Sequence, residues 1–256
     1  MSQEINNVLN EVEKVKISVV MQVNLTDYSG SRSDAVNKFR RAVKSYQNQI
    51  YKNCELIIVS DGCNRSHQIY NREFKEDSSI KFIFLDKNGA PLMYEETDKG
   101  KYYRGFPRRA GVGISTGSLI TYMDSDDYLL PEFTMTLMLI YNAAPDKDWY
   151  INTSWYDSSD HTWEDSNVLH ASDHSKSIEI EGIGGKWTPT QLKPGSIVLT
   201  PWLFMHKSTC LTKWRDTIGF SEDTDFNKRL RSEYPNGYPF ERPIYVRCHY
   251  NNHWDY

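Results

Sequence analysis

Three aspartates follow directly on an apolar run in the stretch LITYMDSDDYLLPEF, residues 119–133. Asp124, Asp126 and Asp127 bring three carboxylates close together, and two such charges at ~4 Å repel each other by about 4 kcal/mol at an effective dielectric of 20. A hard divalent cation, Mg²⁺ or Mn²⁺, would offset this repulsion, because it prefers oxygen ligands and keeps coordination positions open for substrate phosphates. The alternative is a solvated acidic turn before a helix that starts at Pro131, where Asp and Pro are both favoured.

Alternating strands and helices must position these carboxylates. KISVVMQV (16–23) and ELIIVSDG (55–62) are apolar runs of the buried-strand type. Apolar residues between them recur at three- and four-residue steps, which predicts an amphipathic helix capped by Ser33 or Asp34. The same alternation predicts an α/β fold with a Rossmann-like, mostly parallel central sheet flanked by helices and joined by right-handed crossovers. The further expected elements are a helix at 64–76, a strand at 80–85, a helix near 107–116 and a strand at 118–123.

Two acidic groups fall at the same edge of this predicted sheet. Asp61 ends the second strand, and Asp124 follows the strand at 118–123. Ligands of such sheets bind beyond the carboxyl ends of the strands, so both groups are expected at the ligand-binding edge. For Asp61, an Asp-Gly turn without a binding role remains an alternative.

The second half of the chain is less regular. The sequence predicts one strand over 148–156 and then a mobile polar loop over 157–177, which is rich in His and Asp. Residues 1–14 are expected to form a polar N-terminal arm, followed by a single domain over 15–256. The other predicted features are the apolar stretch 195–205, a short helix to about Trp214, a helix from Glu222 to Arg231 and a strand-like stretch over 242–250.

Bulk properties exclude several classes of protein. The formal net charge is -4 and the pI is about 6.0, so the chain as a whole lacks the basic footprint of a nucleic-acid-binding protein. Its apolar runs fall short of the ~20 residues that cross a bilayer, and no basic-then-apolar segment opens it, so a cytoplasmic protein is expected. The cysteines are scattered without C-x-x-C pairing, which predicts reduced, packed thiols rather than a disulfide framework or a zinc ribbon.

Three segments together resemble the family 2 glycosyltransferases of the GT-A fold. STGSLITYMDSDDYLLPEF (115–133) is similar to the segment that carries the family's D-x-D motif, in which a small-residue helix, a glycine, an apolar strand and DSDD occur in this order. KSYQNQIYKNCELIIVSDG (44–62) resembles the family's first helix and second strand, and GFSEDTDF (219–226) resembles its Glu-Asp motif. The resemblance implies an inverting transfer of sugar from a nucleotide-sugar, with 15–130 as the nucleotide-binding half and 131–256 as the acceptor-binding half.

The resemblance also implies the residues that bind the donor. Asp61 would accept a hydrogen bond from the base, usually uracil, and Gln22 and Val23 would line the base pocket. Asp124 and Ser125 would lie near the ribose or the water shell of the metal. The family usually has proline at the position of Gln22 and a second acidic residue at that of Ser60, so the base remains open.

Arg108, in PRRAG, matches an arginine of the family's Arg-Asn pair, and Arg109 replaces the asparagine. An arginine near a diphosphate is chemically sensible. A solvent-facing arginine on a helix is the alternative.

For the metal, the resemblance implies Asp126 as a ligand and a C-terminal histidine that completes the site. His249 matches that histidine best, with His253 as second choice, and neutral imidazole suits manganese better than magnesium. Asp127 is expected to cap the following helix or to support the ligands. Mn²⁺ or Mg²⁺ is therefore the implied cofactor, bridging the diphosphate of a UDP-sugar.

On the acceptor side, the resemblance implies Asp223 as the general base and Glu222 as a residue that positions the acceptor or the base. Acidic residues at a helix N-terminus are also favoured by the helix dipole whatever the function. A single carboxylate opposite the leaving diphosphate suits in-line displacement, and inversion follows; a retaining route would need a second carboxylate as nucleophile. Trp202 is a candidate for contact with the acceptor, although packing in the core would explain it equally well.

Other functions remain as alternatives. A nucleotidyltransferase would be expected to have a Gly-rich phosphate loop near the first strand, and MQVNLTDYSG offers one glycine. A non-catalytic protein that binds nucleotide-sugars or glycans would not need Asp223. A glycan is the preferred acceptor, and a protein or a modified DNA base is the alternative. Contact with DNA would need a basic patch, which Lys99, Lys101, Arg104, Arg108 and Arg109 could supply.

Overall fold

A seven-stranded sheet forms the centre of the molecule, with strand order β14-β7-β12-β5-β1-β2-β3. The structure is a computed structural model, and it describes residues 14–25, 34–86, 101–102, 105–158, 168–170, 177–180, 183, 186–192, 203–218 and 222–248. Neighbouring strands pair in parallel, except that β12 is antiparallel to both of its neighbours. The predicted mostly parallel α/β sheet is therefore confirmed. Its strands are β1 (Ile17–Val23), β2 (Cys54–Asp61), β3 (Ile80–Leu85), β5 (Leu119–Asp124), β7 (Trp149–Asn152), β12 (Phe204–Lys207) and β14 (Gly237–Phe240).

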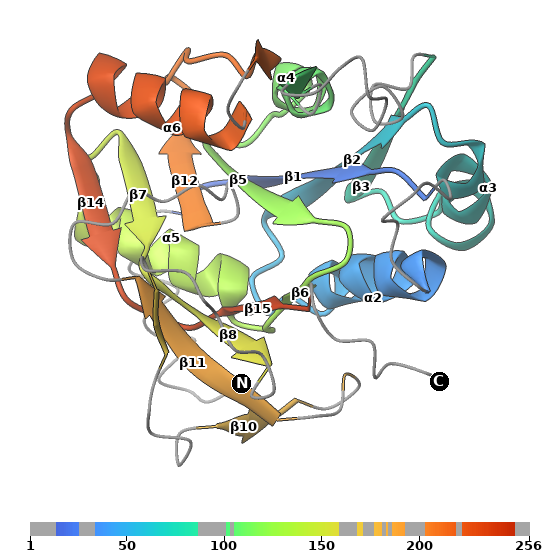
Figure 1. The fold of residues 1–256 in the computed structure, drawn as a ribbon, viewed down its shortest axis with the longest axis horizontal. Coiled ribbons are helices and arrows are strands. Elements are labelled where there is room, and N and C mark those ends of the chain that lie inside the picture. Colours follow the sequence, from blue (N-terminus) through green and yellow to red (C-terminus); the bar gives the residue numbers. More distant parts are fainter. Residues whose placement is uncertain are drawn as a thin grey trace.

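Helices cover both faces of this sheet. Figure 1 shows α4 and α6 on one face and α2 and α5 on the other. On α4, a Cβ atom added to Gly111 would lie 2.5 Å from Cγ1 of Val20, so only glycine lets this helix pack so closely on β1. No helix among the described residues is both long and apolar enough to cross a bilayer. The helices are α2 (Ala35–Gln47), α3 (Asn64–Glu73), α4 (Gly105–Gly113), α5 (Phe133–Ala143) and α6 (Glu222–Glu233).

A second sheet, which the sequence did not predict, lies on the α2 and α5 side of the molecule (Figure 1). Its strand order is β10-β11-β8-β15-β6, with β9 also paired to β11. A separate apolar cluster, which includes Trp187, Ile183 and Val246, packs at this sheet. Its strands are β6 (Tyr128–Leu129), β8 (Ser154–Ser158), β9 (Val168–His170), β10 (Ile178–Glu179), β11 (Lys186–Leu192) and β15 (Tyr245–Arg247); β4 (Lys101–Tyr102) pairs separately with β13 (Thr217–Ile218).

Helix α2 begins where the sequence predicts, because Asp34 is its N-cap residue, although the Asp34 side chain makes no capping hydrogen bond and its φ is 61°. Two other predicted helix boundaries were wrong. Helix α5 begins at Phe133 and not at Pro131, because the Pro131 carbonyl accepts a hydrogen bond from the Ile50 N–H and belongs to the turn. No helix leads to Trp214, since residues 208–216 form turns and irregular backbone.

Strand predictions in the second half also need correction. The predicted strand over 148–156 is two strands, because Thr153 interrupts it and the two halves pair in different sheets. Within the predicted mobile loop, 157–158 belong to β8 and 168–170 form β9. Of the predicted closing strand over 242–250, residues 242–248 are described, and within them the strand covers Tyr245–Arg247. The N-terminal arm lies outside the described residues, apart from residue 14.

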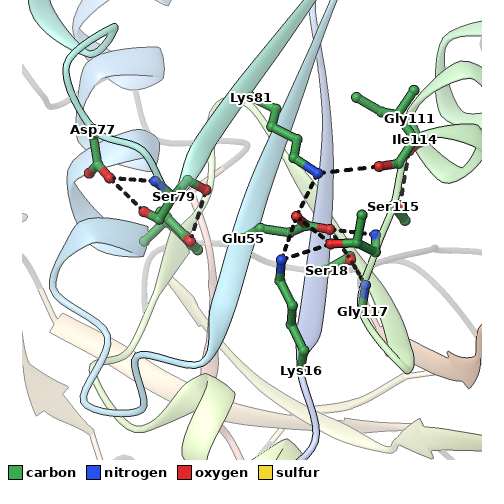
Figure 2. A network of polar contacts seen from close by, with 12 residues as sticks. Lys16, Ser18, Glu55, Asp77, Ser79, Lys81, Gly111, Ile114, Ser115 and Gly117 are labelled. Atoms are coloured by element: carbon green, nitrogen blue, oxygen red, sulfur yellow. Dashed lines mark hydrogen bonds and ion pairs between the residues drawn. The ribbon is translucent and has the colours of Figure 1, made fainter.

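A buried glutamate ties together the amino ends of the central strands (Figure 2). The Glu55 carboxylate, on β2, accepts hydrogen bonds from Ser18 Oγ at 2.6 Å, Lys16 Nζ at 2.9 Å and the Thr116 N–H at 2.7 Å. Lys81 on β3 forms an ion pair with it at 2.8 Å. These contacts lie at the sheet edge opposite Asp61 and Asp124, so they stabilise the fold away from the predicted ligand edge.

All four cysteines are buried and free, as the sequence predicted. Burial raises the pKa of the Cys54, Cys210 and Cys248 thiols. A raised pKa keeps a thiol protonated and unreactive. Their role in this structure is packing.

Candidate active site

The carboxyl ends of β1, β2 and β5 bring four of the predicted donor-binding residues to one edge of the sheet. Gln22 pairs in register with Asp124 on one side and with Val59 on the other, and Val23 pairs with Ser60. Asp61 ends β2, where Gly62 with a φ of 66° turns the chain. The predicted clustering of Gln22, Val23, Asp61 and Asp124 is therefore present, together with the Asp-Gly turn that was its alternative explanation.

Gln22 has an unusual feature at this edge. Its Oε1 atom is buried and has no hydrogen-bond partner among the described residues. A buried polar atom without a partner costs free energy, commonly about 1–3 kcal/mol. The atom lies on β1 directly beside Asp124 in register, so a ligand bound at this edge could supply the missing donor.

Asp127 holds the acidic turn after β5, residues 124–127, against the C-terminal strand. This residue is buried, and its carboxylate accepts hydrogen bonds from the Tyr245 hydroxyl at 2.7 Å and from the Cys248 N–H at 2.8 Å. Burial, together with the neighbouring charges of Asp126 and Asp124, raises the pKa of Asp127 well above its usual value. Asp127 therefore anchors the turn to β15, and the prediction that it caps helix α5 was wrong. Asp124, Ser125 and Asp126 are only partly buried.

Helix α2 holds the same turn from the side. Arg41 and Ser45 are four residues apart and share one stripe of α2, and Gln49 follows just after the helix ends at Gln47. Arg41 Nη2 donates to the Asp126 carbonyl at 2.7 Å, Ser45 Oγ accepts from the Leu129 N–H at 3.1 Å, and Gln49 Nε2 donates to the Leu130 carbonyl at 2.8 Å. Sequence reasoning missed this stripe. The four-residue spacing of these polar residues beside the buried face of α2 was the available signal.

Arg108 is the central cation of the site. Its side chain is 4% exposed, and Nη1 lies 2.6 Å from both Glu222 Oε1 and Asp223 Oδ1. Nη2 lies 3.7 Å from Asp124 Oδ1. Burial alone would lower the pKa of Arg108, but Asp223, Glu222 and Asp124 outweigh it and raise the pKa further, so the residue remains charged. The solvent-facing alternative for Arg108 was wrong.

The carboxylates at the start of α6 differ in exposure. The Glu222 side chain is 2% exposed, whereas that of Asp223 is 18% exposed. Asp225 forms ion pairs with Arg215 at 2.7 Å and Arg229 at 2.6 Å, which is a structural arrangement. Of the three, Asp223 can best reach a bound hydroxyl, while Glu222 is placed to hold Arg108.

A divalent cation fits this edge only as a partner of a phosphorylated ligand. Among the described residues, no group of three or more His, Cys, Asp and Glu side chains is arranged to hold a metal. The partly exposed carboxylates of Asp124 and Asp126 offer hard oxygen atoms. Magnesium commonly binds through one or two carboxylates and completes its shell with water and substrate phosphates. The donor set therefore suits Mg²⁺ or Mn²⁺ bound together with a diphosphate.

Three predicted site residues fall outside the described part of the chain. Trp202, His249 and His253 are not among the described residues, and neither are Lys99 and Arg104 of the possible basic patch. Arg109 is exposed, and its Nη1 donates to the Trp214 carbonyl at 3.2 Å. The roles expected for the tryptophan and the histidines stay predictions.

No family model matches the sequence. Bacterial proteins named as glycosyltransferases are similar over part of it, among them the following two. An uncharacterized glycosyltransferase of Haemophilus influenzae is 30% identical over 90 residues, 35% of this chain and 31% of that protein. A Campylobacter jejuni protein named GalNAc(5)-diNAcBac-PP-undecaprenol beta-1,3-glucosyltransferase is 30% identical over 99 residues, 38% of this chain and 28% of that protein. The matched stretches thus span less than a third of these relatives.

Solved glycosyltransferases share the fold over most of the chain. Staphylococcus aureus TarS 1–349 in complex with UDP-GlcNAc aligns with a TM-score of 0.62 and 14% identity, covering 91% of this chain and 58% of that one. The Pyrobaculum calidifontis mannosyltransferase PcManGT, in complex with GDP-Man and Mn²⁺, aligns with a TM-score of 0.55 and 7% identity, covering 95% and 61%. The chain therefore has the GT-A fold, and the predicted resemblance to glycosyltransferases is confirmed.

Proposed function

We propose that the chain is a metal-dependent, inverting glycosyltransferase that moves a sugar from a nucleotide-sugar to an acceptor hydroxyl. The observation that carries this proposal is the buried guanidinium of Arg108, which contacts Asp124 at the donor edge and Glu222 and Asp223 on α6. One side chain thus contacts both the carboxylate that we propose for the donor side and the two carboxylates that we propose for the acceptor side.

The donor is proposed to bind in the half formed by residues 15–130. Asp61, Gln22 and Val23 would contact the base, and Asp124 with Ser125 would contact the ribose. Gln22 Oε1, which has no hydrogen-bond partner within the described part of the chain, supports a ligand donor at this edge. A UDP-sugar is the preferred donor, in line with the UDP-GlcNAc complex of TarS. A GDP-sugar is the alternative, in line with the GDP-Man complex of PcManGT.

The metal is proposed to be Mn²⁺ or Mg²⁺, held by Asp126 with support from Asp124 and His249. When bound, such an ion neutralises the charge that develops on the leaving diphosphate. Arg108 adds a fixed positive charge beside Asp124. Arg41, which donates to the Asp126 carbonyl, holds the backbone of the acidic turn in place.

Asp223 is proposed as the general base. It would accept the proton of the acceptor hydroxyl as the oxygen attacks the anomeric carbon and the diphosphate leaves from the opposite face. This single displacement inverts the configuration. Buried Glu222 would act as a positioning residue, because its carboxylate shares the same Arg108 nitrogen at 2.6 Å and has almost no exposure to an acceptor.

The acceptor is proposed to be a glycan, bound by the half formed by residues 131–256 with Trp202 as a contact. The name of the Campylobacter relative, a glucosyltransferase of a GalNAc-containing compound, is consistent with this choice. A DNA base or a protein is the alternative. Arg108 does not support DNA binding, because its charge is buried in ion pairs and cannot form part of a surface patch. A non-catalytic nucleotide-sugar or glycan-binding protein is the remaining possibility.

Asp223→Asn tests the proposal. Asparagine keeps the shape of the side chain and can still accept from Arg108, so nucleotide-sugar affinity should change by less than about threefold, or roughly 0.7 kcal/mol. Loss of a general base should lower kcat by about 10²- to 10⁴-fold. Sugar transfer and nucleotide binding would be measured on the same preparation.

Asp225→Asn is the matched control, because it removes a carboxylate two residues away on the same helix that is paired with Arg215 and Arg229. Its kcat should stay within about threefold of wild type, although its stability falls. Wild-type turnover by Asp223→Asn would show that the base is wrongly assigned. Nucleotide binding without transfer to any acceptor in the wild type would favour the non-catalytic alternative.

A further inference from the structure

A buried aromatic layer lies directly against Arg108. The Arg108 guanidinium carbon is 4.9 Å from the centroid of the Trp214 ring. The same indole also contacts Phe226 of α6, whose ring stacks on it at 3.9 Å with an interplanar angle of 5°. Trp214 is 1% exposed, so it is a buried ring that contacts both Arg108 and the helix that carries Asp223.

Hydrogen bonds fix the orientation of this indole. Trp214 Nε1 donates to the Tyr122 hydroxyl at 2.8 Å, and the same hydroxyl lies 2.8 Å from His206 Nε2. His206 Nδ1 lies 2.9 Å from the Lys207 carbonyl, which can only accept. Nδ1 therefore carries the proton, and Nε2 must accept from Tyr122. These hydrogen bonds form a series, which we call the Trp214–Tyr122–His206 hydrogen-bond chain, in which each group donates to the next, from Trp214 to the Lys207 carbonyl.

The side chains of this hydrogen-bond chain are uncharged and buried. Tyr122 and His206 are each 1% exposed. Burial lowers the pKa of His206 to about 4, so the imidazole is uncharged at neutral pH and has the single tautomer that the contacts require. Trp214 Nε1 and His206 Nδ1 each donate once, and the Tyr122 hydroxyl accepts from Trp214 and donates to His206, so one arrangement of donors and acceptors satisfies all of these atoms.

The hydrogen-bond chain and the aromatic rings around it connect β5, α6 and α4, the elements that carry the charged residues of the site. Tyr122 lies two residues before Asp124 on β5, and residues two apart on a strand share a face. Phe226 lies three residues after Asp223 on α6, and residues three apart on a helix are neighbours. Arg108 on α4 lies against the indole between them.

We propose that the hydrogen-bonded chain Trp214–Tyr122–His206 is a positioning device that holds Arg108 in the orientation in which it links Asp124 to Glu222 and Asp223. The guanidinium is planar, and its Nη1 meets two carboxylates at 2.6 Å, so a tilt of the indole beneath it would lengthen one or both contacts. The expected effect on catalysis rests on the proposed function. The expected energetic coupling between Tyr122 and Arg108 is independent of the proposed function.

Tyr122→Phe tests the catalytic consequence. It leaves the Trp214 N–H without an acceptor and His206 without its donor, while the phenyl ring keeps its place. We expect kcat for sugar transfer to fall at least ~10-fold with the donor Kd within about threefold, because small misplacements of catalytic groups cost up to ~10² in rate. Trp214→Phe, which keeps a ring beneath Arg108 but removes the N–H, should behave in the same way.

Tyr150→Phe is the matched control. Tyr150 is 0% exposed and donates to the Ala144 carbonyl at 2.7 Å, so its substitution also removes one buried hydroxyl. It should lower the urea midpoint to a similar degree as Tyr122→Phe but leave kcat unchanged. Equal kcat losses in Tyr122→Phe and Tyr150→Phe, or no loss in either, would overturn the proposal.

A double-mutant cycle gives a readout that does not require transferase activity. The urea midpoints of Tyr122→Phe and Arg108→Lys, alone and combined, should be non-additive, whereas those of Tyr150→Phe and Arg108→Lys should add. Glu222→Gln replaces Arg108→Lys if the latter does not fold. Additive shifts in both cycles would refute the positioning role. Coupling without sugar transfer by the wild type would leave that role intact and refute the proposed function instead.

Discussion

Replacement of Glu55 by glutamine should cost this fold a large part of its stability at neutral pH. The carboxylate is almost fully buried, and it receives hydrogen bonds or ion pairs from Lys16, Lys81, Ser18 and both the N–H and the hydroxyl of Thr116. A glutamine of the same shape keeps one oxygen acceptor. The side-chain NH₂ group of the glutamine would face Lys16, Lys81 and the Thr116 N–H, which are themselves donors.

The size of the effect follows from the exposure of the partners. Removal of one member of a buried ion pair costs about 3–5 kcal/mol, whereas an exposed pair contributes at most about 1 kcal/mol. The Glu55 side chain is 3% exposed, but those of Lys16 and Lys81 are each 37% exposed and remain hydrated when the charge is removed. The free energy of unfolding should therefore fall by about 2–3 kcal/mol in Glu55→Gln.

The pH dependence of this difference has a definite sign. Burial alone would raise the pKa of Glu55, but the contacts from Lys81, Ser18, Thr116 and Lys16 outweigh it and hold the pKa well below its usual value near 4.3. A group whose pKa is lowered on folding contributes its full stabilisation above the unfolded-state pKa and loses it as the pH falls through the folded-state pKa. The difference between wild type and Glu55→Gln should be constant from about pH 7 to pH 5 and shrink below about pH 4.

Urea unfolding at pH 7, 5 and 3 measures the difference directly. Glu73→Gln is the control, because Glu73 forms a bidentate contact with Arg40 at 2.8 Å on the surface and should cost less than about 1 kcal/mol. A loss of unfolding free energy in Glu55→Gln that is no larger than that in Glu73→Gln at pH 7 would contradict the stabilising role of the Glu55 carboxylate. A loss that grows as the pH falls would contradict it as well.

Two further predictions concern the acidic turn. Asp126→Ala should abolish the metal dependence of nucleotide binding while the fold stays intact, which titration with and without a chelator will test; unchanged metal dependence would remove Asp126 from the metal site. Arg41→Met removes the hydrogen bond to the Asp126 carbonyl and should weaken nucleotide binding by about 3- to 30-fold, since a hydrogen bond from a charged group contributes about 1.5–3 kcal/mol and part of it is retained by water. Arg40→Met, on the same helix but paired with Glu73, is its control and should bind nucleotide normally.

Much of the central sheet could be predicted from sequence because its strands are buried on both faces. The run over 55–61 is buried throughout, and a continuous apolar stretch bounded by Asp-Gly indicates such a strand. Helix α2 was predictable because Phe39, Ala42, Val43 and Tyr46 repeat on one face and are all buried. These signals are local, and the structure confirms them.

The second sheet could not be predicted in the same way. Its strands are short, and β11 contains Pro189, which argues against a strand in sequence reasoning. The sequence over 148–156 is typical of one strand. In the structure, the Thr153 N–H donates to the Phe240 carbonyl, and the residues after Thr153 pair in the second sheet. Such a change of sheet depends on partners far away in the sequence.

In the candidate site, too, some features follow from local sequence and others depend on contacts between residues far apart in the chain. Asp61 and Asp124 were predictable because a parallel sheet brings its carboxyl ends to one edge. Arg108 was expected near the diphosphate, but its pairing with Glu222 could not be predicted, since an exposed arginine is the usual case and Glu222 lies 114 residues further along the chain. The role of Trp214 depends on a stack with Phe226 and a hydrogen bond to β5, and no sequence spacing indicates either.

The donor site can be tested by calorimetric titration of the purified protein with UDP, GDP and several UDP-sugars, first with Mn²⁺ present and then with the metal chelated. We expect tight binding of one nucleotide and of the nucleotide-sugars that contain it, with the affinity lost when the metal is removed. Binding that is unaffected by chelation would contradict the metal site at Asp126. No binding of any nucleotide under either condition would contradict the assignment of the carboxyl edge as a donor site.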